Sequence, residues 1–417
     1  MMKRREFVGA AVASVVSLAG GRTARASAGD SGSVESVSSR HGIGPHCAGT
    51  KIAEVACELF RRSPGRPAWS EPLIGVDSLN ARVHHWGDPA PGQPVLGARP
   101  PFTAPNGIRD DYNILDWPGK ALWDPVQGDW WFSGGPTGNQ DPASPTIVRY
   151  RPADDRFVHW QGMASRQGGI WPPSGHAHSF DAADLDVQGR RLWRHLTPHA
   201  SEPYGFKLGW FDIDTFASGR VEGDRFQNDD YPTIAFMPEN RQLHLIRPQP
   251  GGSANIRRFD VDSGKWAAAP LRGPPGSAGP SCYHRGAIYY TTSRGHFARI
   301  LPDGHVQDCR PTPVTMSRPV NGDARYAILL PLGDDLHAFC GNGDIWRYSP
   351  QSDEWGVTPH DRIVMERVDG GSTPAGRNGL SRSCVGPVAA FGVALFCAMR
   401  RDPRDRGFVA KAWVWKP

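Results

Sequence analysis

The feature of this 417-residue chain that most limits its fold is a recurring turn. Short dipeptides typical of tight turns recur at intervals of about 45 to 61 residues, and an apolar run follows each of them. These turns are expected at Gln127-Gly128, Gln188-Gly189, Asn240-Arg241, Arg285-Gly286, Gly333-Asp334 and Phe391-Gly392. A repeat of this length predicts one supersecondary unit that is used several times around a common core.

Most units contain a second hairpin after the first. The pattern is clearest at Ile147–Tyr150 with Phe157–Trp160, at Ile256–Asp260 with Lys265-Trp266, and at Ile345–Tyr348 with Glu354-Trp355. Two hairpins make a four-stranded antiparallel sheet. The chain also holds 49 glycines and 39 prolines, which favours many turns and argues against a helical bundle.

An aromatic residue ends the third strand of these units, a Trp lies in the fourth, and Gly134-Gly135 forms a double glycine after the second strand of the first unit. This alternation resembles the kelch-type β-propeller of the galactose oxidase central domain, over roughly residues 72–417. The resemblance implies an all-β propeller fold. We count six blades, with seven as the alternative if Leu73–Trp86 belongs to an extra partial blade.

The two ends of the repeat region complement each other. The last unit supplies a third strand, Phe408–Trp415, and stops at Pro417 without a fourth. Near the front, Leu73–Trp86 aligns without gaps on Ile147–Trp160. We therefore expect an N-terminal strand to complete the C-terminal blade, because this pairing satisfies edge hydrogen bonds that an open ring would leave unpaired.

Residues 1–26 have the layout of an export signal. A basic start precedes the apolar stretch Phe7–Gly20 and the small residues around Ala24 and Ala26. The string Lys3–Val8 resembles the twin-arginine signal, which implies export of a folded protein across a bacterial inner membrane, to the periplasm or beyond. The apolar stretch is shorter than the roughly 20 residues that span a bilayer, so no stable membrane insertion is expected after cleavage. The alternative is an uncleaved membrane anchor.

A linker is expected between this signal and the repeats. Residues 27–49 are rich in Ser and Gly, and Thr50–Arg62 has apolar residues at helical spacing, with Thr50 as a possible N-cap. The predicted domains are therefore the signal at 1–26, a flexible linker with one short helix at 27–71, and a single propeller at 72–417. The mature chain is expected to be a monomer.

The formal net charge of +5 does not indicate a nucleic-acid partner. The first 26 residues carry four of these five net charges, so the basic character belongs to the export signal. The remaining chain is almost neutral.

Seven cysteines permit disulfides in an exported protein, and the odd number leaves at least one thiol unpaired. Cys47 and Cys57 are the candidate local bridge, whereas Cys340 and Cys397 lie in apolar runs typical of buried free thiols. The cysteine and histidine spacings do not match a zinc site, and neither a metal nor another cofactor is predicted.

Ligands of a propeller usually bind near one mouth of its central channel, so the segments that lead into the innermost strands are candidates. Aligning the repeats brings acidic, imidazole, phenol and guanidinium groups into these segments: Asp111, Tyr112, His176, His178, Asp230, Tyr231, Tyr283, Arg325, Tyr326 and Arg382. Trp171, in a Gly/Pro-rich loop, could stack on a sugar or a peptide. The alternative is that these residues cap turns and satisfy backbone groups between blades.

The densest cluster is His176 and His178, followed by Asp181 and Asp184. Alternation along a strand would put both histidines on one face, where they could hydrogen-bond a sugar or act as an acid/base pair. The residue types are similar to those of propeller-fold polysaccharide lyases, which implies His178 as base and Tyr231 or Tyr283 as acid. Arg325 and Arg382 would then neutralise a uronate carboxylate.

Two functions from different classes follow from these patterns. The first is a non-catalytic exported propeller that binds a glycan, a peptide or an envelope protein at its channel mouth. The second is a polysaccharide lyase at the same mouth. Copper-oxidase chemistry of the galactose oxidase type is disfavoured, since Cys282-Tyr283-His284 is one blade entrance of six with nothing to select it.

Overall fold

The computed structural model describes the chain in segments, and every structural statement below refers to them: residues 51–62, 67–69, 74–77, 82–85, 120–134, 146–151, 156–161, 182–196, 207–215, 217–221, 232–247, 249–276, 278–316, 327–340, 343–358, 383–401 and 408–417. The described strands form six sheets, which we number 1 to 6 in chain order of their innermost strands.

Sheets 1 to 3 come first in the chain. Sheet 1 contains β4 (Leu122–Asp124), β5 (Asp129–Gly134), β6 (Thr146–Arg151) and β7 (Arg156–Gln161), with β3 (Arg82–His85) at its outer edge. Sheet 2 contains β8 (Ala183–Asp186), β9 (Arg191–Leu196), β10 (Lys207–Asp212) and β11 (Ser218–Arg220). Sheet 3 contains β12 (Thr233–Met237), β13 (Gln242–Arg247), β14 (Gln249–Asp260), β15 (Lys265–Trp266) and β16 (Leu271–Gly276).

Sheets 4 to 6 continue the pattern. Sheet 4 contains β17 (Ala278–His284), β18 (Ala287–Thr292), β19 (Phe297–Ile300) and β20 (Val306–Cys309), and sheet 5 contains β21 (Ala327–Leu332), β22 (Asp335–Cys340), β23 (Ile345–Ser349) and β24 (Glu354–Thr358). Sheet 6 contains β25 (Ser383–Val388), β26 (Val393–Arg401), β27 (Phe408–Lys416), β1 (Ala68–Trp69) and β2 (Ile74–Asp77), with the 3-10 turn η4 (Ala389–Phe391) between β25 and β26.

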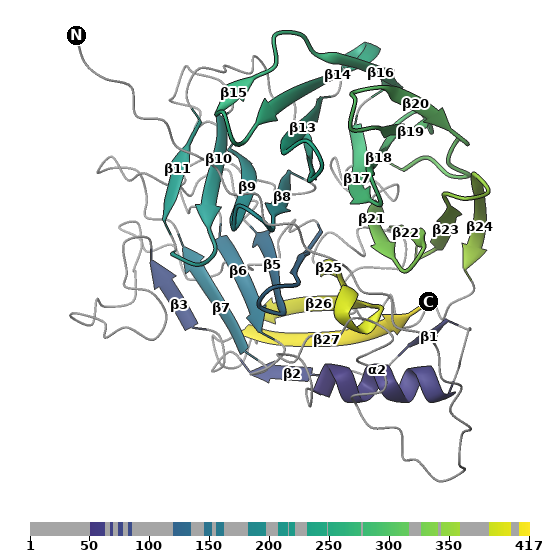
Figure 1. Cartoon of the computed structure of the whole chain (residues 1–417). Coiled ribbons are helices and arrows are strands. Elements are labelled where there is room, and N and C mark those ends of the chain that lie inside the picture. Colours follow the sequence, from purple (N-terminus) through teal and green to yellow (C-terminus); the bar gives the residue numbers. More distant parts are fainter. Residues whose placement is uncertain are drawn as a thin grey trace, which may run out of the picture.

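The six sheets stand around a common centre, each with its first strand innermost (Figure 1). Each inner strand contacts the inner strand of the next sheet, and β25 of sheet 6 contacts β4 of sheet 1, which closes the ring. A separate buried apolar cluster fills every seam between neighbouring sheets. The fold is therefore an all-β propeller, as the repeat predicts.

The hairpin turns lie where the sequence predicts them. The dipeptides at Gln188-Gly189, Arg285-Gly286 and Phe391-Gly392 each fall between the first and second strands of their sheets. Arg190, Arg241 and Arg285 have positive φ angles in these turns, a conformation that is uncommon for residues other than glycine. The paired polar turn residues mark these positions in the sequence, but they do not indicate which of them is left-handed.

Closure by N-terminal strands is also confirmed. β1 and β2 both pair antiparallel with β27, the last strand of the chain. The predicted strand segment at residues 73–86 is divided between two sheets, because β2 joins sheet 6 whereas β3 pairs in parallel with β7 of sheet 1. Sheet 6 thus begins at Ala68, ahead of the expected domain start at residue 72.

The helix α2 (Lys51–Arg62) covers the seam between sheets 6 and 1 (Figure 1). Its buried residues Ile52, Ala53, Ala56 and Leu59 pack with Trp130 of sheet 1 and Val414 of sheet 6, among others. Cys57 on this helix is a buried free thiol. The predicted Cys47–Cys57 disulfide is therefore wrong, although Cys47 itself lies outside the described residues. Among the described helices, α2 included, none has the length and apolar character needed to cross a membrane.

Candidate functional site

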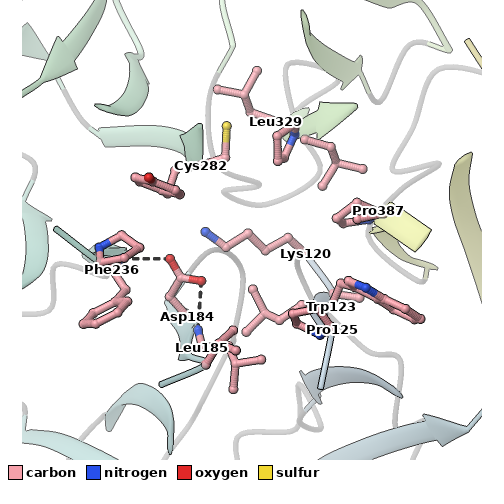
Figure 2. Close-up of a pocket in the computed structure, with 17 residues that line it drawn as sticks. Lys120, Trp123, Pro125, Asp184, Leu185, Phe236, Cys282, Leu329 and Pro387 are labelled. Carbon is pink, nitrogen blue, oxygen red and sulfur yellow. Dashed lines mark hydrogen bonds between the residues drawn. The ribbon is translucent and has the colours of Figure 1, made fainter. Parts of the chain in front are cut away.

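A cavity of about 440 Å³ lies at the centre of the ring (Figure 2). Its wall takes residues from all six inner strands: Leu122 and Trp123 of β4, Asp184 and Leu185 of β8, Phe236 of β12, Cys282 and Tyr283 of β17, Leu329, Leu330 and Pro331 of β21, and Pro387 of β25. Most of these side chains are apolar. The volume lies within the usual range of small-molecule sites, roughly 300 to 1,000 Å³.

The cavity lies toward the end of the channel where the inner strands turn into the second strands. Pro125, Val187 and Pro238, all in or beside these hairpin turns, line it, and Ala389 of η4 does so in sheet 6. We call this end the hairpin mouth. The predicted site was placed at the opposite end, where the chain enters each inner strand.

Lys120 reaches across the channel from the start of sheet 1 (Figure 2). Its Nζ donates hydrogen bonds to the carbonyl oxygens of Ile234 at 3.3 Å and Ser281 at 3.1 Å, which belong to β12 and β17. Only 6% of the residue is exposed. A buried ammonium group is costly unless oxygen atoms replace its lost hydration, and the two carbonyl groups do so here.

Asp184 points into the cavity from β8 (Figure 2). Its Oδ2 accepts a hydrogen bond from the backbone N–H of Phe236 at 2.8 Å, and its Oδ1 accepts one from the N–H of Leu185 at 2.8 Å. The sequence suggests Asp184 as part of a ligand cluster with His176 and His178. In the structure, its carboxylate joins the inner strands of sheets 2 and 3.

Tyr283 lies at the rim of the cavity. Its hydroxyl group donates to Oε1 of Glu239 and accepts the backbone N–H of Gly286 at 3.1 Å. Burial raises the pKa of Tyr283, and the hydrogen bond to Glu239 raises it further. Tyr283 therefore holds its proton and links the hairpins of sheets 3 and 4.

Two arginines connect neighbouring hairpins around the same mouth. Arg190 donates to both carboxylate oxygens of Asp124 at 2.8 and 2.7 Å, and its Nε donates to Asp214 at 2.8 Å. One sheet further, Arg241 binds Asp186 and Asp262 in the same way. Hydrogen bonds to these carboxylates raise the pKa of both arginines. Asp124 is fully buried and Asp186 nearly so, which makes the guanidinium groups necessary counter-charges.

The predicted placement of Cys282-Tyr283-His284 at a strand entrance is wrong. These residues end β17, directly before the hairpin turn, whereas the strand begins at Ala278. The error arises because the Gly/Pro-rich residues before Ser281 look like a loop although they are part of the strand. Whether Tyr283 acts as an acid stays a prediction.

The other predicted site residues lie outside the described segments, and their roles stay predictions: Asp111, Tyr112, Trp171, His176, His178, Asp230, Tyr231, Arg325, Tyr326 and Arg382. The expected entrance of the first inner strand is nevertheless corrected. β4 starts at Leu122 and is preceded by Lys120, so the entrance is well after Asp110–Tyr112.

Sequence reasoning missed Lys120, although a signal for it exists. Counting back from the turn at Gln127 by the length that separates Thr233 from Asn240 leads to Lys120, so a strict spacing rule would have found it. In the described part of the chain, no group of three or more His, Cys, Asp or Glu residues is arranged to hold a metal ion.

Comparisons with known proteins give a likeness of structure only. Neither a family model nor a curated protein sequence matches the chain. Among solved structures, a protein assigned as TolB from Agrobacterium tumefaciens is 12% identical over 58% of this chain and 80% of its own, with a TM-score of 0.39. The periplasmic gluconolactonase PpgL of Pseudomonas aeruginosa is 14% identical over 71% of this chain and 84% of its own, with a TM-score of 0.41. At these values the chain is similar to both in structure, and the likeness says nothing about its activity.

Proposed function

We propose that this protein is an exported, non-catalytic β-propeller that binds an apolar group of its ligand in the cavity at the hairpin mouth. The observation that carries the proposal is the cavity itself, with leucine, proline, phenylalanine and valine side chains around most of its wall. A cavity of this composition gains free energy by excluding water from an apolar surface, about 25 cal/mol for each Å² buried.

The polar groups of the cavity are already engaged with the protein. Lys120 binds two carbonyl oxygens, Asp184 binds two backbone N–H groups, and Tyr283 binds Glu239. Sugar recognition needs several polar side chains that can turn toward hydroxyl groups, whereas an aliphatic group needs only shape and apolar surface. The cavity therefore favours an aliphatic small molecule, or the apolar side chain of a peptide or envelope protein, over a glycan.

Export is the second part of the proposal, and it rests on the sequence of residues 1–26. The two arginines at Arg4 and Arg5, the apolar stretch Phe7–Gly20 and the small residues near Ala26 support a twin-arginine-type signal. The ligand would then be a component of the cell envelope or the medium. Peptide mapping of the protein from the native host, with an N-terminus after Ala26, tests this part on its own.

Two variants of neighbouring hairpins test the binding site. Val187→Trp places a large side chain at a half-buried position that lines the cavity, while Val126→Trp places the same side chain at an exposed position of the sheet 1 hairpin. We expect the first to fill the cavity and the second to leave it open. Both positions tolerate a larger side chain better than the fully buried wall does.

The readout is a thermal shift with three kinds of probe: medium-chain aliphatic alcohols, leucine- and proline-containing peptides, and neutral or acidic oligosaccharides. A probe present at 100 times its Kd stabilises the folded state by about 2.7 kcal/mol. We expect an increase in Tm with the aliphatic or peptide probes for the wild type and for Val126→Trp, but not for Val187→Trp. A shift with oligosaccharides alone, unchanged in Val187→Trp, contradicts the proposal.

The alternative of a polysaccharide lyase would use His178 as base and Tyr231 or Tyr283 as acid. The Tyr283 hydroxyl donates its hydrogen bond to Glu239 at the hairpin end of β17, and this contact does not favour the role of acid. Formation of unsaturated products from acidic polysaccharides, lost in Tyr283→Phe or His178→Ala, would support the lyase over the binding protein.

A further inference from the structure

Two cysteines occupy opposite register positions in sheet 6, the sheet that closes the ring. Cys384 of β25 and Cys397 of β26 are direct partners in the antiparallel register, between the pairs Ser383 with Ala398 and Val385 with Phe396. Directly opposite residues of an antiparallel pair lie on the same face of the sheet. The hairpin turn at Gly392 thus brings these two cysteines, which lie on either side of it in the sequence, into register.

The backbone at these two positions suits a covalent bridge. Opposite residues of antiparallel strands have Cα atoms about 4.5 to 5.5 Å apart, and disulfides span Cα separations of about 4.4 to 6.8 Å. The register alone therefore satisfies the main distance requirement, and because Cys384 carries a reduced thiol in the structure, the bridge has to form by oxidation. Cys384 is fully buried, in the cluster that joins α2, sheet 1 and sheet 6.

The register distinguishes this pair from the other described cysteines. Opposite Cys282 lies Tyr289, opposite Cys309 lies Phe297, and opposite Cys340 lies Ala327. Among the described strands, Cys384 and Cys397 are the cysteines that stand opposite each other.

We propose that Cys384 and Cys397 are a modification site that forms an intrachain disulfide when the protein meets an oxidising disulfide. The two thiols lose two protons and two electrons and form one S–S bond. A small-molecule or protein disulfide accepts them and is reduced to two thiols, so that atoms and electrons balance.

The bridge would lie next to the contact that closes the propeller. The carbonyl oxygen of Val385, the residue after Cys384, accepts the N–H of Ala121 at 2.8 Å, and Gly386 lies against Trp130 of sheet 1. A bond between β25 and β26 holds the inner strand of sheet 6 in the position that these contacts need. The disulfide is therefore expected to stabilise the closed ring.

One tryptic peptide contains both cysteines, because residues 383–400 have no internal Lys or Arg. The purified full-length chain is incubated with reduced and oxidised glutathione, unfolded, alkylated with iodoacetamide and digested without reduction. We expect this peptide to carry no alkyl group and to be lighter by two hydrogen atoms after oxidation, and to carry two alkyl groups after reduction. A peptide that remains alkylated twice under oxidising conditions overturns the proposal.

The Cys384→Ala variant and a matched control test the consequence for stability. The wild type is expected to lose several degrees of Tm on addition of dithiothreitol, whereas Cys384→Ala shows no such dependence. Cys340→Ala, which removes another buried thiol, keeps the dependence of the wild type. A dithiothreitol effect that persists in Cys384→Ala contradicts the proposal, and because the oxidant is added in vitro, none of these outcomes depends on export or on ligand binding.

Discussion

The seam between sheets 1 and 2 and the seam between sheets 6 and 1 use different interactions. Between sheets 1 and 2, an apolar cluster is supplemented by an ion pair from Arg190 of sheet 2 to Asp124 of sheet 1, and Asp214 of sheet 2 also binds this arginine. Between sheets 6 and 1, an apolar cluster is supplemented by a backbone hydrogen bond from Ala121 to Val385, while β1 and β2 add to β27 within sheet 6. The helix α2 covers this second seam.

The difference follows from connectivity. Sheets 1 and 2 are consecutive in the chain, so the chain itself keeps them close and side chains suffice to fix their orientation. Sheets 6 and 1 meet from opposite ends of the chain, where an unclosed ring would expose strand edges. A directional backbone hydrogen bond and close packing fix the orientation of two sheets that no short connection of the chain holds together.

The largest expected effect is on the first seam. Arg190→Met leaves Asp124, which is 0% exposed, without its cationic partner, at a cost of about 3 to 5 kcal/mol in the free energy of unfolding. Urea denaturation measures it. Arg285→Met is the matched control, because Arg285 also has a positive φ angle in a hairpin turn but pairs with an exposed Asp334, and it should cost less than about 1 kcal/mol. Equal losses in the two variants would mean that the buried ion pair does not stabilise the seam.

The second seam should be sensitive to added volume. A Cβ atom at Gly386 would lie 2.2 Å from Nε1 of Trp130 and 2.6 Å from the carbonyl oxygen of Ala121, so Gly386→Ala should cost about 3 kcal/mol. The control is Gly356→Ala, where a Cβ atom meets nothing within 4 Å. A thermal melt of Gly386→Ala that matches that of Gly356→Ala would show that the closing seam is loosely packed.

The contribution of two buried histidines to the stability of the fold is expected to depend on pH. Burial lowers the pKa of His244 to about 4 and that of His337 to about 3, with nearby arginines adding to the effect, and His337 packs edge-on against Trp415 across the seam of sheets 5 and 6. Both imidazoles are neutral in the folded protein, whereas an unfolded histidine binds a proton below about pH 6.5. Their contribution is therefore complete above pH 6.5 and is lost as the pH falls toward 4 and 3.

Between pH 7.5 and 5, each histidine should remove about 2 kcal/mol of stability. Urea denaturation at several pH values measures the loss, and His337→Phe should lose about half of the acid sensitivity that the two histidines produce. An acid dependence unchanged in His337→Phe would place its source in other groups.

The smallest expected effect concerns the helix over the closing seam. Nζ of Lys416 lies 5.0 Å from the centre of the Phe60 ring, a cation–π contact between α2 and the last strand. Phe60→Leu keeps an apolar side chain but removes the ring, and should cost about 0.5 to 1 kcal/mol. Arg62→Gln, which breaks an exposed pair within α2, serves as a control with a smaller change in Tm. A smaller loss for Phe60→Leu than for this control would show that the contact contributes nothing.

Much of the propeller can be predicted from the sequence because its signals are local. Turn residues and alternating apolar residues identify β5, β13 and β22 without knowledge of their partners. Two Gly/Pro-rich strands, β16 and β17, escape this approach. A Cβ atom at Gly273 would meet the hydroxyl of Tyr290 at 2.1 Å, and one at Gly279 would meet Thr291 at the same distance, so these glycines serve close packing between sheets 3 and 4 and within sheet 4.

The cavity could not be predicted in the same way. Its wall combines single residues from six strands that are distant in the sequence, and residue type does not reveal which end of an inner strand lies near the cavity. The buried partners of Arg190 and Arg241, Asp124 and Asp186, lie 66 and 55 residues earlier in the chain, beyond the reach of any local pattern. Even the clearest prediction at the site, Tyr283, was assigned to the wrong end of its strand.

The reach of Lys120 across the channel has a consequence for how the chain folds. Its acceptor in β17 is 161 residues further along, and its backbone partner Val385 is in the last sheet. The first inner strand cannot complete its contacts until synthesis of the last sheet is finished, and contacts of such long range form slowly. The contacts that close the ring are therefore expected to form only after the last sheet has been synthesised.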